Sequence, residues 1–322
     1  MTKEYLDLKM DFMFKQLFGH PSRKNITLAF LNDLLTRKGQ DRIVDVQYEN
    51  TALIKSDSDG KTGLLDILVY TSNHERINVE IQVENQHNMR ERVLYYWTKL
   101  FSSTLEAGQN YTELVPTIMI SILNYLLFPH QTKRFHNRFH VYEDLEFFMW
   151  SPHLEFHTFD LTKFKSKWKK YRRGMKAKPP AAYPWLMMLS AADYRKKTID
   201  TDILQELEEL AMNEQEVLDA IKEWESLSAN RENKVLYDAR LKFLRDQLAN
   251  IRGEREEGRE EGRQEGLKEG IQKGIEKERE TVIKKMLSKG TAPETIADML
   301  DYPLEEIKKI QWEITRRQLM FP

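Results

Sequence analysis

Between residues 44 and 84, apolar and polar side chains alternate with a period of two, in three runs that turn-forming residues separate. The runs are "VDVQYENTAL", "LLDILVY" and "INVEIQVE", and the separating segments are "SDSDGKTG" and "TSNHER". Such alternation is typical of half-buried strands, and clusters of Gly, Asn, Asp and Ser are typical of turns. The segment therefore predicts an antiparallel three-stranded meander, which commits this part of the chain to a sheet.

Helical spacing of apolar residues flanks the meander. Before it, "DFMFKQLFG" and "SRKNITLAFLNDLL" predict two short helices, with Ser22 as the cap between them. After it, "NMRERVLYYWTKLFSSTLEAG" predicts a helix that ends at Gly108, and "TIMISILNY" predicts a central strand because apolar residues occupy both of its faces. One more strand is predicted over "LEFHTFDL". This order of elements predicts an α/β fold on a mixed sheet flanked by helices.

The second half of the chain is predicted to be helical. The stretches "ILQELEELAMNEQEVLDAIKEW" and "KVLYDARLKFLRDQLANI" have amphipathic spacing. A repeat then follows over residues 253–277, in which glycine recurs at every fourth position from 258 to 274. Because each glycine costs a helix ~1 kcal/mol, the repeat is either a helix that charge pairs and a partner helix support, or a solvated spacer.

These changes of pattern divide the chain into four predicted segments. Residues 1–162 form the core with the sheet, 163–252 a basic stretch and helices, 253–280 the glycine repeat as a helix or linker, and 281–322 a small helical module. The breaks within the last segment resemble the spacing of a helix-turn-helix unit. Few basic residues lie on its second helix, which favours a packing module over a DNA reader.

Composition limits the classes of function. The chain has 322 residues, of which 40% are hydrophobic, and its 50 basic residues nearly balance 51 acidic ones, so no net field attracts nucleic acid or a membrane. Cysteine is absent, which leaves carboxylates, carbonyls and histidines as metal ligands. The histidines lack zinc spacing, and His130, His136 and His140 are expected on the surface. Without a signal core or a spanning apolar run, the protein is expected to be cytoplasmic.

Two acidic residues are predicted to face each other across the second turn of the meander. If that turn is centred near Asn73, the numbers of opposed residues sum to about 146, and Asp66 lies opposite Glu80. Opposed side chains on one face of an antiparallel pair have Cβ atoms ~5 Å apart, so two carboxylates repel each other there. A magnesium ion would compensate, because it prefers carboxylate oxygens and bound water. Gln82 lies one pleat further along the same face, close enough to position a water or a phosphate oxygen.

A solvated edge strand is the alternative explanation of Glu80 and Gln82, because any half-buried strand alternates. The residues that share a strand face with Asp66 are Leu68 and Tyr70, and an unpaired charge beside such side chains is costly. This environment favours a functional site over a solvated face.

With Asp66 on one strand, Glu80 to Gln82 on the next and helices on both sides, the chain resembles the PD-(D/E)XK phosphodiesterase core, with glutamine in the lysine position. More specifically, it is similar to the Rpn family of recombination-promoting nucleases and transposases. The matching stretches cover most of the chain and include "DFMFKQLFG", "RERVLYYWTKL", "LVPTIMISILNYLLF" and the glycine-glutamate tail. The resemblance implies a restriction-endonuclease-like fold, magnesium-dependent DNA cleavage and a bacterial cytoplasmic setting.

By this resemblance, Asp66 and Glu80 are the metal-binding carboxylates, and the backbone carbonyl of Ile81 is a further ligand. Gln82 takes the position of the usual lysine and with Asp66 and Glu80 makes up the implied catalytic set. A neutral glutamine can only hydrogen-bond, whereas a lysine also stabilises developing negative charge.

The missing positive charge has three candidates in the sequence, namely Lys61, Lys15 and Arg92, and the sequence leaves the choice among them open. Asp11 is either a third carboxylate of the site or a residue that caps or pairs locally. Both questions depend on how the flanking helices approach the sheet.

A basic stretch, "KFKSKWKKYRRGMKAK", runs from Lys163 to Lys178 and holds nine basic residues and no acid. Basic side chains neutralise phosphates and exposed aromatic rings stack on bases, so the stretch predicts a contact with nucleic acid. The residues predicted to make this contact are Lys163, Lys165, Lys167, Trp168, Lys169, Lys170, Tyr171, Arg172 and Arg173. The alternative is a solvated loop that keeps the chain soluble.

Taken together, the residues and the resemblance predict a Mg2+-dependent endonuclease that hydrolyses DNA phosphodiester bonds in recombination or transposition. One alternative is a nuclease-like protein that binds DNA or a protein without cutting. Another is a scaffold whose C-terminal helical tail joins copies into a homo-oligomer. The presence of both acidic residues favours the nuclease.

Overall fold

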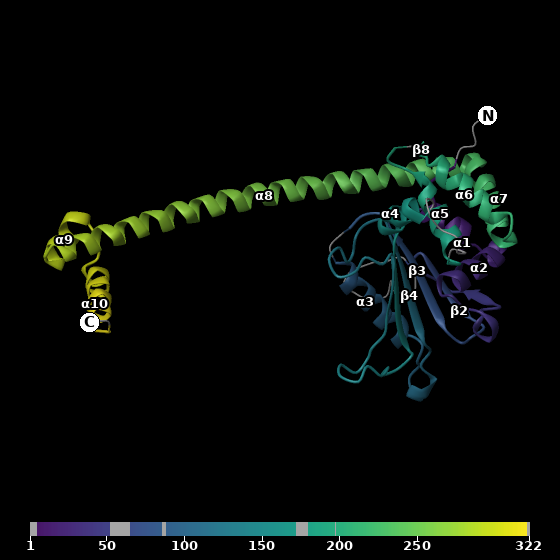
Figure 1. Cartoon of the computed structure of the whole chain (residues 1–322), viewed down its shortest axis with the longest axis horizontal. Coiled ribbons are helices and arrows are strands. Elements are labelled where there is room, and N and C mark those ends of the chain that lie inside the picture. Colours follow the sequence, from purple (N-terminus) through teal and green to yellow (C-terminus); the bar gives the residue numbers. More distant parts are fainter. Residues whose placement is uncertain (1–4, 52–64, 86–87, 172–179, 197, 321–322) are drawn as a thin grey trace. The chain divides into compact units, whose positions relative to one another are not determined.

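The computed structural model describes residues 5–51, 65–85, 88–171, 180–196 and 198–320. Its internal contacts divide the chain into two compact units, Met1–Phe243 and Leu244–Pro322. The predicted α/β fold, a mixed sheet flanked by helices and followed by a helical C-terminal region, is confirmed (Figure 1). The four predicted segment boundaries remain predictions.

A six-stranded mixed sheet is the centre of the first unit. Its strands are β1 (Val46–Tyr48), β2 (Ile67–Thr71), β3 (Arg76–Gln82), β4 (Thr117–Leu123), β5 (His136–Phe139) and β6 (Leu154–Asp160). Their spatial order is β1-β2-β3-β4-β6-β5, in which β3, β4 and β6 are parallel and the other neighbours are antiparallel. Every residue of β4 is buried, which confirms the predicted central strand.

Helices precede and follow these strands in the first unit, and helices also form the second unit. They are α1 (Asp11–Phe18), α2 (Lys24–Leu34), α3 (Met89–Ser102), α4 (Leu161–Tyr171), α5 (Tyr183–Ala191), α6 (Thr201–Ala211), α7 (Gln215–Ala229), α8 (Arg231–Ser288), α9 (Pro293–Leu300) and α10 (Leu304–Met320). Short 3-10 turns lie at Pro21–Arg23, Gly39–Asp41 and Tyr111–Glu113, and the two-residue strands β7 (Ala192–Asp193) and β8 (Thr198–Ile199) pair antiparallel.

The β2–β3 hairpin has the predicted register. Ile67 pairs with Val79 and Tyr70 pairs with Arg76, so opposed residue numbers sum to 146. Because side chains alternate along a strand, Ile67, Val79 and Ile81 face one side of the sheet, and Leu68, Asn78 and Glu80 face the other. The hairpin therefore directs its polar even-numbered residues of β3 to a single face.

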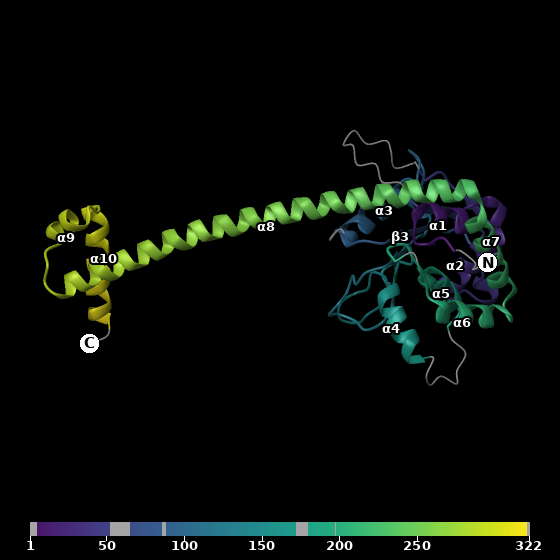
Figure 2. The same ribbon diagram turned by 90° about the horizontal axis from the view of Figure 1, so that it is seen from above.

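The two faces of the sheet have different covers. On the face that carries Leu68 and Met119, α3 supplies Tyr96 and Leu100 to a buried apolar cluster, and Trp97 donates its indole N–H to the Thr117 carbonyl at 3.0 Å. The other cover contains α1, α2, α5 and α7, which contact one another and gather together in Figure 2. In this layer Phe18 stacks on Phe30 with ring centroids 4.2 Å apart, which fixes α1 against α2.

Three local predictions need correction. Ser22 does not cap α2, because it lies inside the 3-10 turn, whose N-cap is His20. The helix after the meander ends at Ser102 rather than at Gly108, and Gly108 has a φ of 90° in the following loop. Strand β5, four residues of mostly polar side chains that pair antiparallel with β6, was not predicted.

In the second unit, the glycine repeat is helical. It lies within α8, where Arg263 pairs with Glu260 at 2.8 Å and Lys273 pairs with Glu269 at 2.9 Å. Such pairs one turn apart offset part of the cost of glycine in a helix. After α8, the side chains of Ile283, Ile296 and Ile307 form a small core that holds α9 and α10 against the end of α8. Among the described helices, none is long and apolar enough to cross a membrane.

Candidate active site

The three parallel strands end at one edge of the sheet. Gln82 at the end of β3 pairs with Leu123 at the end of β4, and Leu123 pairs with Asp160 at the end of β6. Ligands of α/β sheets bind outside the carboxyl ends of such strands. The candidate carboxylates Asp66 and Glu80 lie next to this edge, where β2 begins and β3 ends.

Asp66 precedes β2, and its carboxylate closes the open end of the hairpin. The backbone N–H of Ile81 donates to Asp66 Oδ2 at 2.9 Å, in the place where a ladder hydrogen bond would otherwise continue. By the register of the hairpin, Asp66 lies opposite Glu80, as predicted. Asp66 and Glu80 are only 9% and 2% exposed, so both carboxylates are removed from bulk water.

Two basic residues from the flanking helices compensate these carboxylates. Lys15 of α1 lies with Nζ 3.2 Å from Asp66 Oδ1, and Arg92 of α3 forms an ion pair with Glu80 Oε1. Protein cations therefore offset part of the repulsion that the sequence analysis assigned to a magnesium ion. Of the three candidates for the missing positive charge, Lys15 and Arg92 are both at the site, and Lys61 lies outside the described residues.

Burial controls the protonation of both acids. It raises the pKa of Glu80 to about 7, an effect that the nearby charge of Asp66 reinforces and the guanidinium of Arg92 opposes. Burial likewise raises the pKa of Asp66, against the lowering effect of Lys15 and of the Ile81 N–H. Carboxylates whose pKa values are raised by burial and by a nearby negative charge are common at functional sites.

The oxygens of Glu80 are used unequally. Oε1 accepts from Gln82 Nε2 at 3.0 Å as well as from Arg92, whereas Oε2 is buried and has no hydrogen-bond partner among the described residues. A buried carboxylate oxygen without a partner is costly unless another ligand completes it. The N–H and C=O of a strand residue face the same neighbouring strand, so the Ile81 carbonyl also faces the side of Asp66.

This donor set fits a hard cation that keeps water ligands. Asp66, Glu80 and the Ile81 carbonyl offer only oxygen, which is what magnesium prefers, and one or two acidic side chains are its usual protein ligands. In the part of the chain that the structure describes, no three His, Cys, Asp or Glu side chains gather into a group that could hold a metal. A metal here would therefore depend on the two carboxylates, a carbonyl, and water or substrate oxygens.

Two further residues border the site. Asp11 does not cap α1; it lies 4.0 Å from Arg240 of α8, and its charge contributes to the raised pKa of Asp66. Tyr125 follows β4, and burial together with the charge of Glu80 raises its pKa to about 12. Tyr125 was not predicted from the sequence, although its position two residues after Leu123 at the end of the central strand could have indicated it.

The basic stretch begins on α4, at the same edge of the sheet, but two of its predicted contacts need correction. Trp168 is only 2% exposed and donates to Glu206 at 2.9 Å, so its ring is not available for base stacking. Lys163 donates to the carbonyls of Phe128 and Thr132, which ties α4 to the loop after β4. The physical reason is that α4 is amphipathic and packs its aromatic side into the core.

The remaining predicted contact residues differ in accessibility. Lys165 and Lys167 are half-buried, and Lys167 lies 5.7 Å from the ring centre of Phe135, whereas Lys169 is exposed. The side chains of Lys170 and Tyr171 and the whole of residues 172–179, with Arg172 and Arg173, lie outside the described part of the chain.

The predicted surface position of two histidines is wrong. His136 of β5 is half-buried, stacks on Phe159 and lies 2.8 Å from His157 Nδ1, and His140 lies against Glu155. Burial and the neighbouring His157 lower the pKa of His136 to about 4. His130 is exposed, as predicted.

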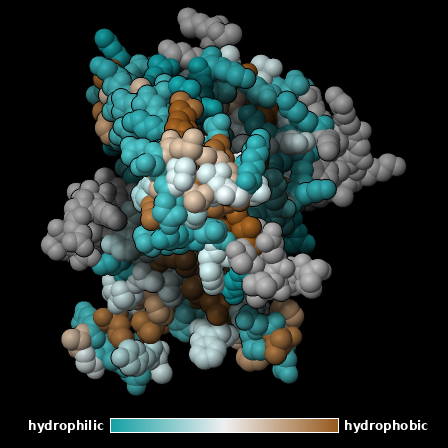
Figure 3. Space-filling model, turned by 90° about the vertical axis from the view of Figure 1, so that its left-hand side faces the viewer, coloured by the Kyte–Doolittle hydropathy of each residue, from teal (hydrophilic) through white to brown (hydrophobic). Residues whose placement is uncertain are grey.

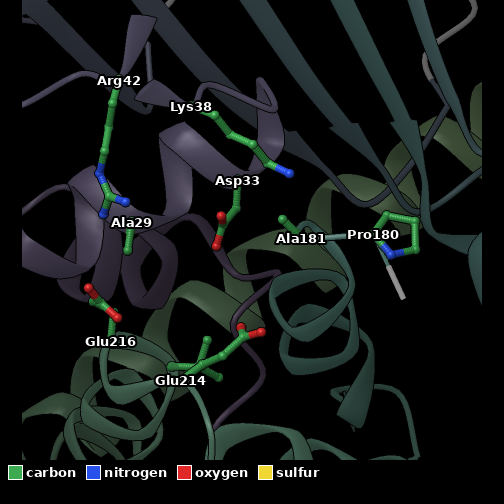
Figure 4. Close-up of a pocket in the computed structure, with 9 residues that line it drawn as sticks. Ala29, Asp33, Lys38, Arg42, Pro180, Ala181, Glu214 and Glu216 are labelled. Carbon is green, nitrogen blue, oxygen red and sulfur yellow. The ribbon is translucent and has the colours of Figure 1, made fainter. Parts of the chain in front are cut away.

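A separate cavity of about 590 Å³ opens between α2 and α7, in the helical layer. Figure 4 shows Lys38 and Arg42 on one side of it, Glu214 and Glu216 on another, and Asp33 between them. Asp33 accepts from Trp185 Nε1 at 2.7 Å, and burial raises its pKa. None of the lining residues belongs to the Asp66 and Glu80 site, so this cavity is distinct from the candidate active site.

The pKa of Glu80 predicts how stability depends on pH. Because the folded-state value of about 7 exceeds the ordinary 4.5, Glu80 contributes stability that is present below pH 4.5 and is lost as the pH rises through 7. In EDTA we expect Glu80→Gln to equal the wild type near pH 4.5 and to be more stable by up to about 3 kcal/mol at pH 8. Urea unfolding from pH 4.5 to 8 measures this, with the exposed Glu106→Gln as control. Parallel profiles for wild type and Glu80→Gln would contradict it.

Comparison with known proteins agrees with this geometry. A family model described as PD-(D/E)XK nuclease family transposase matches residues 8–254, a range that contains the whole sheet, Asp66, Glu80 and helices α1 to α7. Among curated proteins and among solved structures, none matches. Because the family match extends over most of the chain and includes the hairpin with its two carboxylates, the chain belongs to the PD-(D/E)XK nuclease family transposases.

Proposed function

We propose that this protein is a magnesium-dependent DNA endonuclease that hydrolyses phosphodiester bonds, with its active site at Asp66 and Glu80. The observation that supports this most is the buried Oε2 of Glu80, which finds no partner in the described part of the chain and lies beside a second buried carboxylate. Burying two carboxylates, one of them with an unsatisfied oxygen, lowers the stability of the fold, which favours a functional reason for the arrangement. A role in transposition or recombination and a bacterial cytoplasmic setting belong to the same proposal, on the strength of the family.

Asp66, Glu80 and the Ile81 carbonyl would hold the metal. When bound, magnesium supplies an activated water and neutralises charge on the phosphate in the transition state. Gln82 orients the carboxylate of Glu80. Its amide donates to Glu80 Oε1, which leaves Oε2 as the oxygen that would bind the metal.

Lys15 would supply the positive charge that a lysine at position 82 of β3 would otherwise provide. Its side chain is 33% exposed, so the ammonium can reach both Asp66 and a bound phosphate or water. Arg92 is 23% exposed and pairs with Glu80. Fixed positive groups aimed at a developing charge are an effective source of rate acceleration. The substitution of glutamine in the lysine position is therefore compatible with cleavage.

DNA contact is proposed along the exposed part of α4 and the basic residues that follow it. Asp160 caps α4 by accepting from the Lys163 N–H at 2.9 Å, which starts the helix directly at the carboxyl edge of the sheet. Lys169 is exposed and can bind a backbone phosphate, and the same role is proposed for the basic residues that follow it in the sequence, while Lys163 and Trp168 hold the helix in place.

The second candidate function is binding of DNA without cleavage. The ion pair of Arg92 with Glu80 favours it, because the guanidinium already offsets part of the negative charge that would attract a metal. Oligomerisation through the C-terminal tail is a further proposal that is independent of catalysis. Cleavage assays separate the first two functions directly.

We expect Asp66→Asn and Glu80→Gln each to abolish magnesium-dependent nicking or linearisation of plasmid DNA, because each removes a carboxylate of a two-carboxylate site. EDTA should have the same effect on the wild type, and the exposed Asp219→Asn should cleave normally. Magnesium should also raise the unfolding midpoint of the wild type and not of Glu80→Gln, since a ligand of the folded state stabilises it. Normal cleavage by Asp66→Asn would remove the proposed site.

The role of Lys15 has its own test. Lys15→Met should lower the cleavage rate by roughly 10²-fold or more, the usual effect of losing one charge-stabilising group. Gln82→Lys should retain or raise activity, and in the Lys15→Met background it should restore part of the loss, because it returns the ammonium to β3. Single-turnover rates of the four proteins measure this. If Lys15→Met cleaves like the wild type, Lys15 serves only to neutralise Asp66.

DNA binding by the basic stretch predicts a salt effect. Replacing Lys169, Lys170, Arg172 and Arg173 with glutamine should weaken binding to all sequences alike and flatten the slope of log affinity against log salt by ~0.9 for each phosphate that the variant no longer neutralises. Fluorescence anisotropy of Asp66→Asn protein in calcium measures this slope. A matched control changes the exposed Lys268, Lys273, Lys285 and Lys309. An unchanged slope in the first variant would make the stretch a solvated segment.

A further inference from the structure

The segment Phe139–Trp150, called here the apolar arm, links β5 to β6 as a short hairpin. Tyr142 and Met149 form an antiparallel bridge, the Trp150 N–H donates to the Val141 carbonyl at 2.9 Å, and the Glu143 N–H donates to the Phe148 carbonyl at 2.9 Å. At the turn, Phe147 has a φ of 58°. The arm therefore has a defined backbone, and its side chains have fixed directions.

Most side chains of the arm are apolar and lie in solvent. Leu145 is 84% exposed, Trp150 80% and Phe147 73%, and five more large hydrophobic side chains of the arm are at least 39% exposed, namely Phe139, Val141, Tyr142, Phe148 and Met149. Figure 3 shows brown, hydrophobic surface at the lower end of the face in view. Isolated exposed hydrophobic residues are ordinary, but eight within twelve residues mark an interaction surface.

The size of this surface fits a protein interface. A large side chain covers 150–250 Å², so the exposed fractions of the eight residues amount to roughly 900 Å². The largest apolar patch on a typical monomer is about 300–600 Å². A stable protein–protein interface buries about 800 Å² on each partner. The arm thus offers as much apolar surface as one side of a standard interface requires.

Charge and position argue against DNA as the occupant. The tip of the arm carries Glu143, Asp144 and Glu146 and no basic residue, which would repel phosphates. Phe139 pairs with Phe156 near the beginning of β6, so the arm leaves the sheet at the edge where the parallel strands begin. The candidate active site lies at the opposite edge, and in Figure 1 the loops below β4 lie at the end of the sheet away from α4.

The strand that carries the arm is an edge strand. β5 is the last strand in the sheet order, and within the described residues no strand pairs with its outer side. An unpaired edge next to exposed apolar side chains is a template for another strand. A second copy is the simplest match, because a two-fold axis pairs the arm of one copy with the arm of the other in antiparallel orientation.

We propose that two copies of this chain associate through the apolar arm, in a symmetric dimer. Antiparallel pairing of the arms buries Leu145, Phe147 and Trp150 of each copy and directs the two acidic tips away from each other. It leaves both carboxyl edges of the sheets open to substrate. The dimer is independent of the proposed nuclease activity and of the C-terminal tail.

The absence of cysteine in the natural chain makes a direct test possible. Single-cysteine variants Phe139→Cys and Trp150→Cys of the full chain are treated with a short bis-maleimide. We expect a covalent dimer from both. Met212→Cys, which replaces a 73% exposed residue at the end of α6, should stay monomeric on a denaturing gel. Equal cross-linking at all three positions, or none at 139 and 150, overturns the proposal.

Mass measurement tests the same surface without a cross-linker. By light scattering at tens of micromolar, Leu145→Ser/Phe147→Ser/Trp150→Ser should have half the mass of the wild type. The matched control Met212→Ser/Val235→Ser/Leu236→Ser, at similarly exposed apolar positions, should keep the wild-type mass. Far-UV circular dichroism and urea midpoints confirm that both variants are folded. A monomeric wild type overturns the proposal, and so does an arm variant with the wild-type mass. If the arm variant keeps that mass but loses DNA affinity, the arm binds DNA and the proposal is equally overturned.

Discussion

The burial of two opposed carboxylates at the end of one hairpin is the constraint around which the first unit is organised. Asp66 and Glu80 face each other at the open end of the β2–β3 ladder, so they cannot move apart without breaking its register. Their mutual repulsion and desolvation are offset by Lys15 from one helical layer and Arg92 from the other. The site therefore depends on α1 and α3 packing on opposite faces of the sheet, and the two layers meet at this charge cluster.

The hairpin could be predicted because residues close together in the sequence determine its structure. A short turn and strict alternation fix the register of a hairpin, and the register alone decides that Asp66 lies opposite Glu80. The central position of β4 was also predictable, since "TIMISIL" has no polar face to present to water. In both cases the pattern of side chains within about ten residues determines the structure.

What could not be predicted depends on contacts between distant segments. Lys15 and Arg92 were two candidates among three, and only the approach of α1 and α3 to the sheet brings them to the carboxylates. Trp168 lies in a run of lysines that suggests exposure, yet its helix turns the indole inward to Glu206, 38 residues later. β5 has the polar sequence "HNRF" and no alternation of its own, because its order depends on pairing with β6 and on the stacking of His136 on Phe159.

The mixed topology separates the proposed catalytic site from the proposed dimer interface. In a sheet with parallel β3, β4 and β6, all three carboxyl ends meet at one edge, and the loops and helix starts there supply Tyr125, Asp160 and α4. The antiparallel β5 returns the chain to the other edge, so the connection between β4 and β6 presents the apolar arm away from the carboxylates. Glu143, Asp144 and Glu146 would repel DNA phosphates from that arm, whereas the DNA contact proposed for α4 lies at the opposite edge. The sign of charge at each edge thus matches the kind of partner proposed for it, phosphate at the carboxyl ends of the strands and protein at their amino ends.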